Sequence, residues 1–132
     1  LRNLATRSPE LGSLLSRYTQ ALIGQISQTV TCNSVHLVRE RLARWLLTLH
    51  DRTDGDELRL SQELMAGMLG VRRATVSTEA RTLQSAGLIR FRRGIVTIED
   101  RKGLESASCE CYRVINALYE RLLPRVPSPA KA

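Results

Sequence analysis

The sequence predicts a mainly α-helical fold, and three patterns in its 132 residues support that class. Apolar residues recur at helical 4-3 spacing over residues 10–32, and two shorter helical stretches meet at Gly70. β-Prone residues are confined to two short runs on either side of Gly94. The predicted order is therefore one long helix, then a helical domain that carries a small β-hairpin.

The first predicted element is a long helix over residues 10–32, a stretch without proline. Its apolar residues fall on more than one face, and a helix of about 33 Å is too long for so small a domain to cover. We expect residues 1–33 to form a dimerisation helix that pairs with a second copy of the chain; a long core helix is the alternative. The dimer interface is expected at Leu11, Leu15, Tyr18, Leu22, Gln25 and Thr29.

A second helix is predicted over residues 35–50, with Asn33 or Ser34 as its N-cap. The acid-rich stretch 51–57 predicts a solvated turn. A hard-cation site is the weaker interpretation of these acids, because the full pattern of a calcium loop is missing. A short strand is expected at residues 57–60.

Two short helices joined by a tight turn are predicted next. Ser61 can cap a helix over residues 62–69, and Gly70 suits the left-handed residue that ends it. A second helix, over residues 72–86, begins almost at once and stops at Gly87. Two helices separated by so few residues, with glycine in the turn, are typical of a helix-turn-helix.

The remaining elements complete a winged domain. Residues 88–98 predict a β-hairpin, or wing, that turns at Arg93-Gly94. A final helix is expected over residues 102–122, and the prolines after it predict a flexible tail over residues 124–132. Residues 34–123 are thus predicted to form a single winged helix-turn-helix domain.

Basic residues are concentrated in one part of the chain. The net charge is +7, and all but Lys102 and Lys131 of the 20 basic residues are arginine, which suits phosphate groups and guanine edges. Six arginines and one acid lie between residues 72 and 93, on the second short helix and on the wing. A solvated charged face is the alternative. The coincidence of charge, helix and basic hairpin predicts binding to double-stranded DNA through its major groove.

The sequence supports neither an enzyme nor a membrane protein. It lacks a Gly-rich phosphate loop, a G-x-S-x-G motif, paired histidines and an evident carboxylate pair. No apolar run approaches the roughly 20 residues of a membrane span, and no stretch has the pattern of a signal peptide. We expect a cytoplasmic protein, with no cofactor bound by these residues.

The three cysteines are expected to be reduced and structural. Cys109 and Cys111 lie on the predicted final helix, where residues two apart point to different sides, and no fourth cysteine stands at zinc-ligand spacing. His36 and His50 are single histidines on a predicted helix. We therefore expect no metal site. The alternative is a thiolate metal- or redox-sensing interaction module in which these cysteines, with Cys32, bind iron or zinc.

Two segments carry a resemblance to a known family. Residues 61–77, SQELMAGMLGVRRATVS, and residues 83–89, LQSAGLI, resemble the DNA-binding half of the cyclic-AMP receptor protein/FNR (Crp/Fnr) family of bacterial transcription regulators. The resemblance extends back through residues 41–47, RLARWLL, and covers about residues 10–122. It implies a homodimer that binds a palindromic operator, with a recognition helix in the major groove.

The resemblance also implies roles for individual residues. Arg73 matches a family arginine that reads guanine, whereas Ala74 and Thr78 differ from the Glu and Arg of the cyclic-AMP receptor, so that protein's operator preference is not carried over. The implied phosphate contacts are Ser61, Arg72, Thr75 and Arg81, and the implied base-edge contacts are Arg73, Ala74 and Thr78. Ser77 on the same helix face, and Arg92 and Arg93 on the wing, complete the expected DNA-binding set.

Family members carry an N-terminal β-roll that senses a small molecule or a redox state. This chain contains no such segment, so we expect it to be a fragment of a longer polypeptide, and the effector stays unnamed. RNA polymerase is a further partner that the resemblance implies. A winged-helix replication or partition protein is the remaining alternative.

Overall fold

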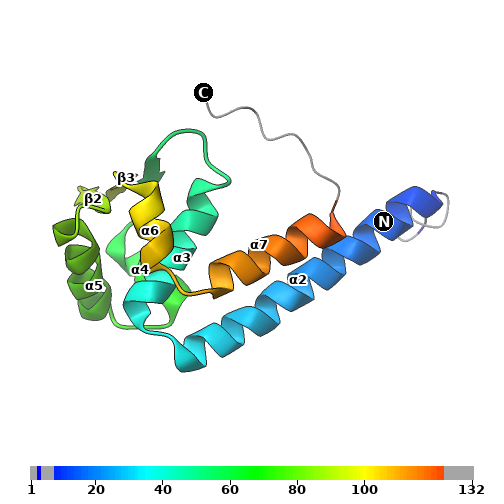
Figure 1. Ribbon diagram of the computed structural model, residues 1–132, viewed down its shortest axis with the longest axis horizontal. Coiled ribbons are helices and arrows are strands. Elements are labelled where there is room, and N and C mark those ends of the chain that lie inside the picture. Colours follow the sequence, from blue (N-terminus) through cyan, green and yellow to red (C-terminus); the bar gives the residue numbers. More distant parts are fainter. Residues whose placement is uncertain (1–2, 4–7, 124–132) are drawn as a thin grey trace.

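The computed structural model describes residues 3 and 8–123, and it confirms the mainly helical class. In Figure 1 the long helix α2 extends away from a group of shorter elements, and α7 runs alongside it. The predicted tail at 124–132 lies outside the described residues. The described elements are α2 (Pro9–Val35), α3 (Val38–His50), β1 (Glu57–Arg59), α4 (Gln62–Leu69), α5 (Arg73–Ser85), β2 (Ile89–Arg92), β3 (Ile95–Ile98), α6 (Arg101–Ala107) and α7 (Cys111–Leu122).

Helix α2 is longer than predicted, and this changes how α3 begins. Asn33 and Ser34 lie inside α2, so the prediction that one of them caps the next helix is wrong. The cap is supplied differently: the backbone N–H of Leu37 donates to Oε2 of Glu40 at 3.0 Å. The side chain of a glutamate in the first turn thereby satisfies a backbone donor that would otherwise be left open.

The core of the winged domain lies around α3. Leu42, Leu46 and Leu47 of this helix are fully buried and pack with apolar residues of α4, α5, α6 and the sheet. The sheet is antiparallel with strand order β1-β3-β2. Its register pairs Val96 with Leu58 on one side and with Phe91 on the other. The predicted wing is confirmed, and β1 joins it as a third strand, a pairing that the sequence did not reveal.

The single final helix predicted over residues 102–122 is wrong, because the chain breaks it into α6 and α7. The hydroxyl of Ser108 donates to the backbone carbonyl of Glu105 at 2.8 Å, and Ser108 itself is extended. A serine that bonds a nearby carbonyl competes with the helical hydrogen bonds. Cys109 therefore lies in a loop, whereas Cys111 is the first residue of α7.

Helix α7 packs directly against α2, and glycine permits the close approach. A Cβ atom added at Gly24 would collide with Cδ2 of Leu118, far inside van der Waals contact. A residue with a side chain at position 24 would therefore require the side chain of Leu118 to move. None of the helices described in the structure is both long and apolar enough to cross a membrane.

Candidate nucleic-acid interface

Helices α4 and α5 form the predicted helix-turn-helix. Ser61 caps α4 by accepting a hydrogen bond from the backbone N–H of Leu64 at 3.1 Å. Gly70 ends α4 in the left-handed conformation, at φ +65°, which glycine adopts without steric cost. The buried guanidinium of Arg41 on α3 donates to the carbonyl of Leu69, the last residue of α4. The turn is therefore held from outside as well as by its own glycine.

Helix α5 divides into an inner and an outer face. Val76, Ala80 and Leu83 are buried and fix the helix to the core. The outer face carries most of the residues expected to contact DNA. Arg72, Arg73, Ala74, Thr78 and Arg81 are exposed, and Thr75 and Ser77 are half-buried. Ser61 is also exposed, at the start of α4.

Two glutamines that were not among the expected DNA-binding residues hold α5 in place. Oε1 of Gln62 on α4 accepts a hydrogen bond from the Ser77 hydroxyl at 2.8 Å and a longer one from Nε of Arg73 at 3.5 Å. Oε1 of Gln84 accepts from the backbone N–H of Phe91 on β2 at 2.7 Å. Ser77 therefore supports the helix, and it also helps to orient Arg73 through their shared partner. Glutamine is too common on helix surfaces for these roles to be visible in the sequence.

The wing places further arginines beside this helix. The hairpin turns through Arg93 and Gly94, both with positive φ, as expected for a tight hairpin turn. Arg92 and Arg93 are exposed, whereas Arg90 forms an ion pair with Glu99 at 3.1 Å. The wing arginines border a hollow of about 330 Å³ on the outer face of the sheet. Its lining is Glu57, Arg90, Arg92, Arg93, Ile95 and Thr97.

The arginines expected to contact DNA differ in their pairing from Arg101 on α6 and from Arg90 on the wing. Arg101 on α6 contacts Asp51 at 2.5 Å and Glu105 at 3.0 Å. Within the part of the chain that the structure describes, five expected DNA-binding arginines have no carboxylate partner. They are Arg72, Arg73, Arg81, Arg92 and Arg93. An exposed group of unpaired guanidinium groups suits a phosphate backbone.

The acid-rich stretch after α3 is an exposed turn, as predicted, and two of its acids hydrogen-bond to neighbouring elements. Asp51 accepts hydrogen bonds from Arg101 and from the Tyr112 hydroxyl, the latter at 2.7 Å. Asp56 lies 2.8 Å from Nε2 of His50, whose Nδ1 lies 2.6 Å from Nη1 of Arg101. These acids therefore join α3 to α6 and α7 through hydrogen bonds and ion pairs.

The residues expected at a dimer interface do not share one environment. Leu11, Tyr18 and Leu22 are exposed, and Leu15 is half-buried. Gln25 instead faces its own chain, because its Oε1 accepts from the Tyr119 hydroxyl of α7 at 2.5 Å. Thr29, also half-buried, donates its hydroxyl to the backbone carbonyl of Gln25 at 2.8 Å. The exposed apolar face of α2 continues through other residues, Ile23, Ile26 and Val30, each more than half exposed.

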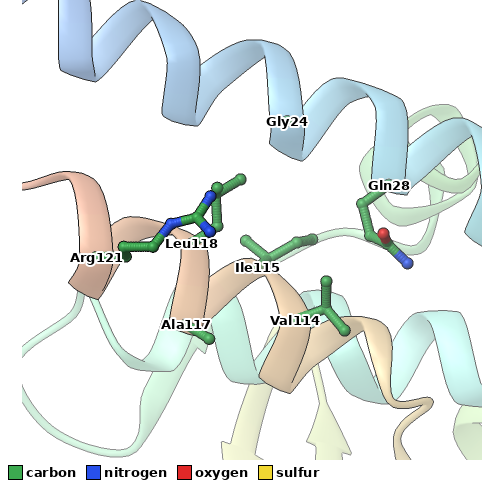
Figure 2. Close-up of a pocket in the computed structure, with 7 residues that line it drawn as sticks. All are labelled: Gly24, Gln28, Val114, Ile115, Ala117, Leu118 and Arg121. Carbon is green, nitrogen blue, oxygen red and sulfur yellow. The ribbon is translucent and has the colours of Figure 1, made fainter.

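A hollow of about 500 Å³ lies beside this helix pair, between α2 and α7. Figure 2 shows Ile115 and Leu118 directed from α7 toward α2 near Gly24, with Arg121 at the side. The remaining lining residues are Gln28, Val114 and Ala117. The pocket is mainly apolar, and it lies next to the exposed face of α2 rather than beside α5.

The potential metal ligands also gather away from α5. Cys32, His36, Cys109 and Cys111 come together where α2 ends and α7 begins. The alternative interpretation of the sequence groups the three cysteines, but it does not include His36. Two features explain why the sequence did not predict this four-residue arrangement. The break between α6 and α7 is not evident in the sequence, and the first pair is separated from the second by more than 70 residues.

Comparison with known proteins gives one family match. A Crp-like helix-turn-helix domain matches residues 40–107, the segment that runs from the first turn of α3 to the end of α6. No similar sequence was found among the curated proteins.

Several solved structures have a similar fold. A CooA mutant from Carboxydothermus hydrogenoformans aligns with a TM-score of 0.69 at 21% identity, over 80% of this chain and 52% of that one. A regulator assigned to the crp/fnr family from Eubacterium rectale gives 0.63 at 23%, over 80% and 49%. A CRP family transcriptional regulator from Thermus thermophilus gives 0.58 at 25%, over 71% and 49%. The chain thus spans about half the length of the solved structures it matches.

Proposed function

The chain belongs to the family of Crp-like helix-turn-helix domains, and from this premise we propose that it is the DNA-reading half of a Crp/Fnr-type transcription regulator rather than an enzyme. The observation that carries the proposal is the grouping of five exposed arginines at α5 and the wing that have no carboxylate partner in the described part of the chain: Arg72, Arg73, Arg81, Arg92 and Arg93. A surface of this kind gains its counter-charge from a polyanion outside the protein.

In this proposal α5 enters the major groove. Arg73 donates to O6 and N7 of a guanine, and Ala74 and Thr78, one turn apart on the same exposed face, contact neighbouring base edges. Gln62 supports the reading position of Arg73, because its amide oxygen accepts from both Arg73 and Ser77. The specificity of the helix then comes from a few residues near its N-terminus.

Phosphate contacts fix the register of α5 in the groove. They are assigned to Ser61, Arg72, Thr75 and Arg81 on the helix-turn-helix and to Arg92 and Arg93 on the wing. The Ser61 oxygen already accepts from Leu64, which leaves its hydroxyl proton free to be donated to a phosphate. Contacts of this kind position the protein but carry little sequence information.

We further propose a homodimer through α2, with residues 1–33 as the dimerisation segment and residues 34–123 as the DNA-binding domain. The support is the exposed apolar face of α2, which includes Leu22, Ile23, Ile26 and Val30 beside the hollow next to α7. An apolar face of this extent on a helix of 27 residues is unusual unless a partner covers it. Gln25 and Thr29 then support the interface from within each chain.

A symmetric dimer dictates the form of the operator. Two copies of α5 related by a two-fold axis would enter successive major grooves about 34 Å apart, so the target is a palindrome. By analogy with its family, the protein would act in the cytoplasm, with RNA polymerase as a further partner and a sensory domain in the same polypeptide.

Selection of bound sites from random duplex DNA tests the DNA-binding proposal. We expect inverted repeats whose half-sites are centred one helical turn apart. Enrichment of single half-sites, or of no sequence, would contradict it.

Analytical ultracentrifugation tests the dimer separately. Ile26→Asp on the apolar face should yield monomers, whereas Gln20→Asp, on another exposed face of α2, should leave the dimer intact. A wild-type protein that stays monomeric at high concentration would contradict the α2 interface.

A further inference from the structure

Four potential metal ligands converge where α2 meets α7. Cys32 lies in the last turn of α2, His36 caps that helix, Cys109 lies in the loop before α7, and Cys111 begins α7. One ligand atom of each lies within 4.8 Å of the others. The three cysteines are free and buried, and the side chain of His36 is only 15% exposed. Chain segments far apart in sequence thus bring three thiols and an imidazole to one point.

Two distances in this cluster match those expected around a single tetrahedral ion. Sγ of Cys32 lies 3.5 Å from Sγ of Cys109, and Sγ of Cys111 lies 3.5 Å from Nδ1 of His36. A tetrahedral Zn²⁺, with bonds of about 2.3 Å to sulfur and 2.0 Å to nitrogen, holds its ligand atoms about 3.5–3.8 Å apart. The ligands of an iron–sulfur cluster bind different iron atoms and lie farther apart, so this group is too compact for one.

The groups around the cluster orient its ligands. Nε2 of His36 lies 3.1 Å from Oε1 of Glu110. A carboxylate only accepts, so Nε2 carries the proton and the lone pair of Nδ1 faces the thiols. A carboxylate that fixes a histidine in this way is a common outer partner of zinc sites. The side-chain amide of Gln28 donates to Sγ of Cys111 at 3.1 Å, a bond that stabilises negative charge on the sulfur.

A buried cation nearby supplies the charge that such a site needs. Arg44 is 5% exposed, and its Nε is among the buried atoms of the described residues that have no hydrogen-bond partner. Burial raises the pKa of the Cys32 thiol, whereas the positive charge of Arg44 acts to lower it. Zn²⁺ with three thiolates and a neutral imidazole carries one net negative charge. The neighbouring arginine would offset that charge inside the protein.

We propose that Cys32, His36, Cys109 and Cys111 bind one Zn²⁺ ion in a closed Cys₃His site. Binding replaces the three thiol protons, which are released to solvent, and changes no oxidation state. Four protein ligands complete the tetrahedron and leave no position open for substrate, so the role of the ion is structural. It ties the end of α2 to the start of α7, the joint between the long helix and the winged domain.

A Cys32–Cys109 disulfide explains fewer of these observations. It would bring those two sulfur atoms to about 2.05 Å from each other. It would assign no role to Cys111, to the inward lone pair of His36 or to the Glu110 carboxylate. All four ligands and their outer partners take part in a zinc site.

Metal analysis of the full chain, purified without chelator, tests the proposal. We expect about one zinc per chain, and after exchange we expect the absorption spectrum of tetrahedral Co²⁺ with thiolate charge-transfer bands. Cys109→Ser should lose the metal, whereas the nearby exposed control Ser106→Ala should keep it. Because loss of a ligand can also unfold the joint, Glu110→Gln provides a milder variant that keeps all four ligands. We expect it to weaken zinc affinity about tenfold.

Three outcomes would overturn the proposal. They are wild-type protein that takes up neither Zn²⁺ nor Co²⁺, a Cys32–Cys109 disulfide in metal-free protein, and iron bound with acid-labile sulfide. The measurement is independent of DNA binding. A zinc-loaded protein that does not bind DNA would contradict the regulator proposal but not the metal site.

Discussion

The outer face of α5 and the cysteine–histidine cluster are both rich in groups that bind ions. They differ in whether these groups are exposed to solvent and in whether they already have partners within the chain. On α5 and at its N-cap, the guanidinium groups of Arg72, Arg73 and Arg81 are exposed and have no carboxylate partner among the described residues. In the cluster the thiols are buried, and Gln28 and Glu110 already hold two of the ligands. Solvated cations suit a large external polyanion, whereas a small buried set of donors suits one enclosed cation.

This difference in exposure also predicts which substitutions affect binding and which affect folding. An exposed, unpaired arginine contributes little to stability, because water already solvates it. Polar groups that burial has removed from water depend on their partners, so loss of a partner costs free energy of unfolding. Changes on α5 should therefore alter ligand affinity with the fold intact. Changes in the cluster should destabilise the fold.

The largest expected effect is that of salt on DNA affinity. If both copies of a dimer contribute their unpaired arginines, six or more phosphates are neutralised. Affinity should then fall roughly a thousandfold between about 50 and 200 mM salt. Fluorescence anisotropy with a selected operator measures this. Zinc content should not change over the same range of salt, because the ligands are buried. A DNA affinity that is independent of salt would contradict binding through the exposed arginines.

Removal of the metal should have the next largest effect, and it should fall on stability. A ligand that binds only the folded state at 100 times its dissociation constant stabilises it by about 2.7 kcal/mol. A strong zinc chelator should lower the free energy of unfolding by that order, as measured by urea denaturation. Arg73→Ala should respond to the chelator as the wild type does. The stability of Cys109→Ser should not change on addition of the chelator. If the stability of the wild type did not change either, the ion would not be structural.

A pair of arginine substitutions tests the division directly. Arg73→Ala should cost about 1–3 kcal/mol of DNA affinity and relax specificity at one base position. Arg101→Ala removes contacts to Asp51 and Glu105, and should instead lower the free energy of unfolding by about 2 kcal/mol. Operator titrations and denaturation curves of both variants measure the two quantities. An equal loss of affinity on all DNA sequences would reassign Arg73 to a phosphate contact.

The sequence predicted helices α4 and α5 well because the signals that set their ends are local. Ser61, Gly70 and Gly87 mark the ends of two short helices, and the structure has α4 and α5 within a residue of the predicted bounds. The wing was equally visible, because alternating residues around Arg93-Gly94 specify a hairpin on their own. Local caps and turns are readable without knowledge of the tertiary contacts.

The sequence offered the three cysteines as a metal site only as an alternative, because the geometry of the cluster depends on tertiary packing. The spacing of Cys109 and Cys111 argues against binding of both to one metal ion only if both residues lie on one helix. The Ser108 hydroxyl, bonded to a preceding carbonyl, breaks that helix. His36 reaches the thiols only because α2 continues past Asn33 to Val35. Both departures are small in residues, and each changes which side chains meet.

The smallest effect concerns a residue whose role also depends on tertiary packing. Gln84 lies on α5 but accepts from the backbone N–H of Phe91 at 2.7 Å, so it connects the recognition helix to the wing. Gln84→Ala should cost about 1 kcal/mol of DNA affinity, because the wing arginines lose their fixed position relative to α5. Faster amide exchange at Phe91, with unchanged exchange at Val76 in the core, would locate the loss at this joint. DNA affinity could instead fall while amide exchange at Phe91 stays as in the wild type. Gln84 would then contact DNA itself, and the DNA-binding surface would include Gln84 as well as the arginines.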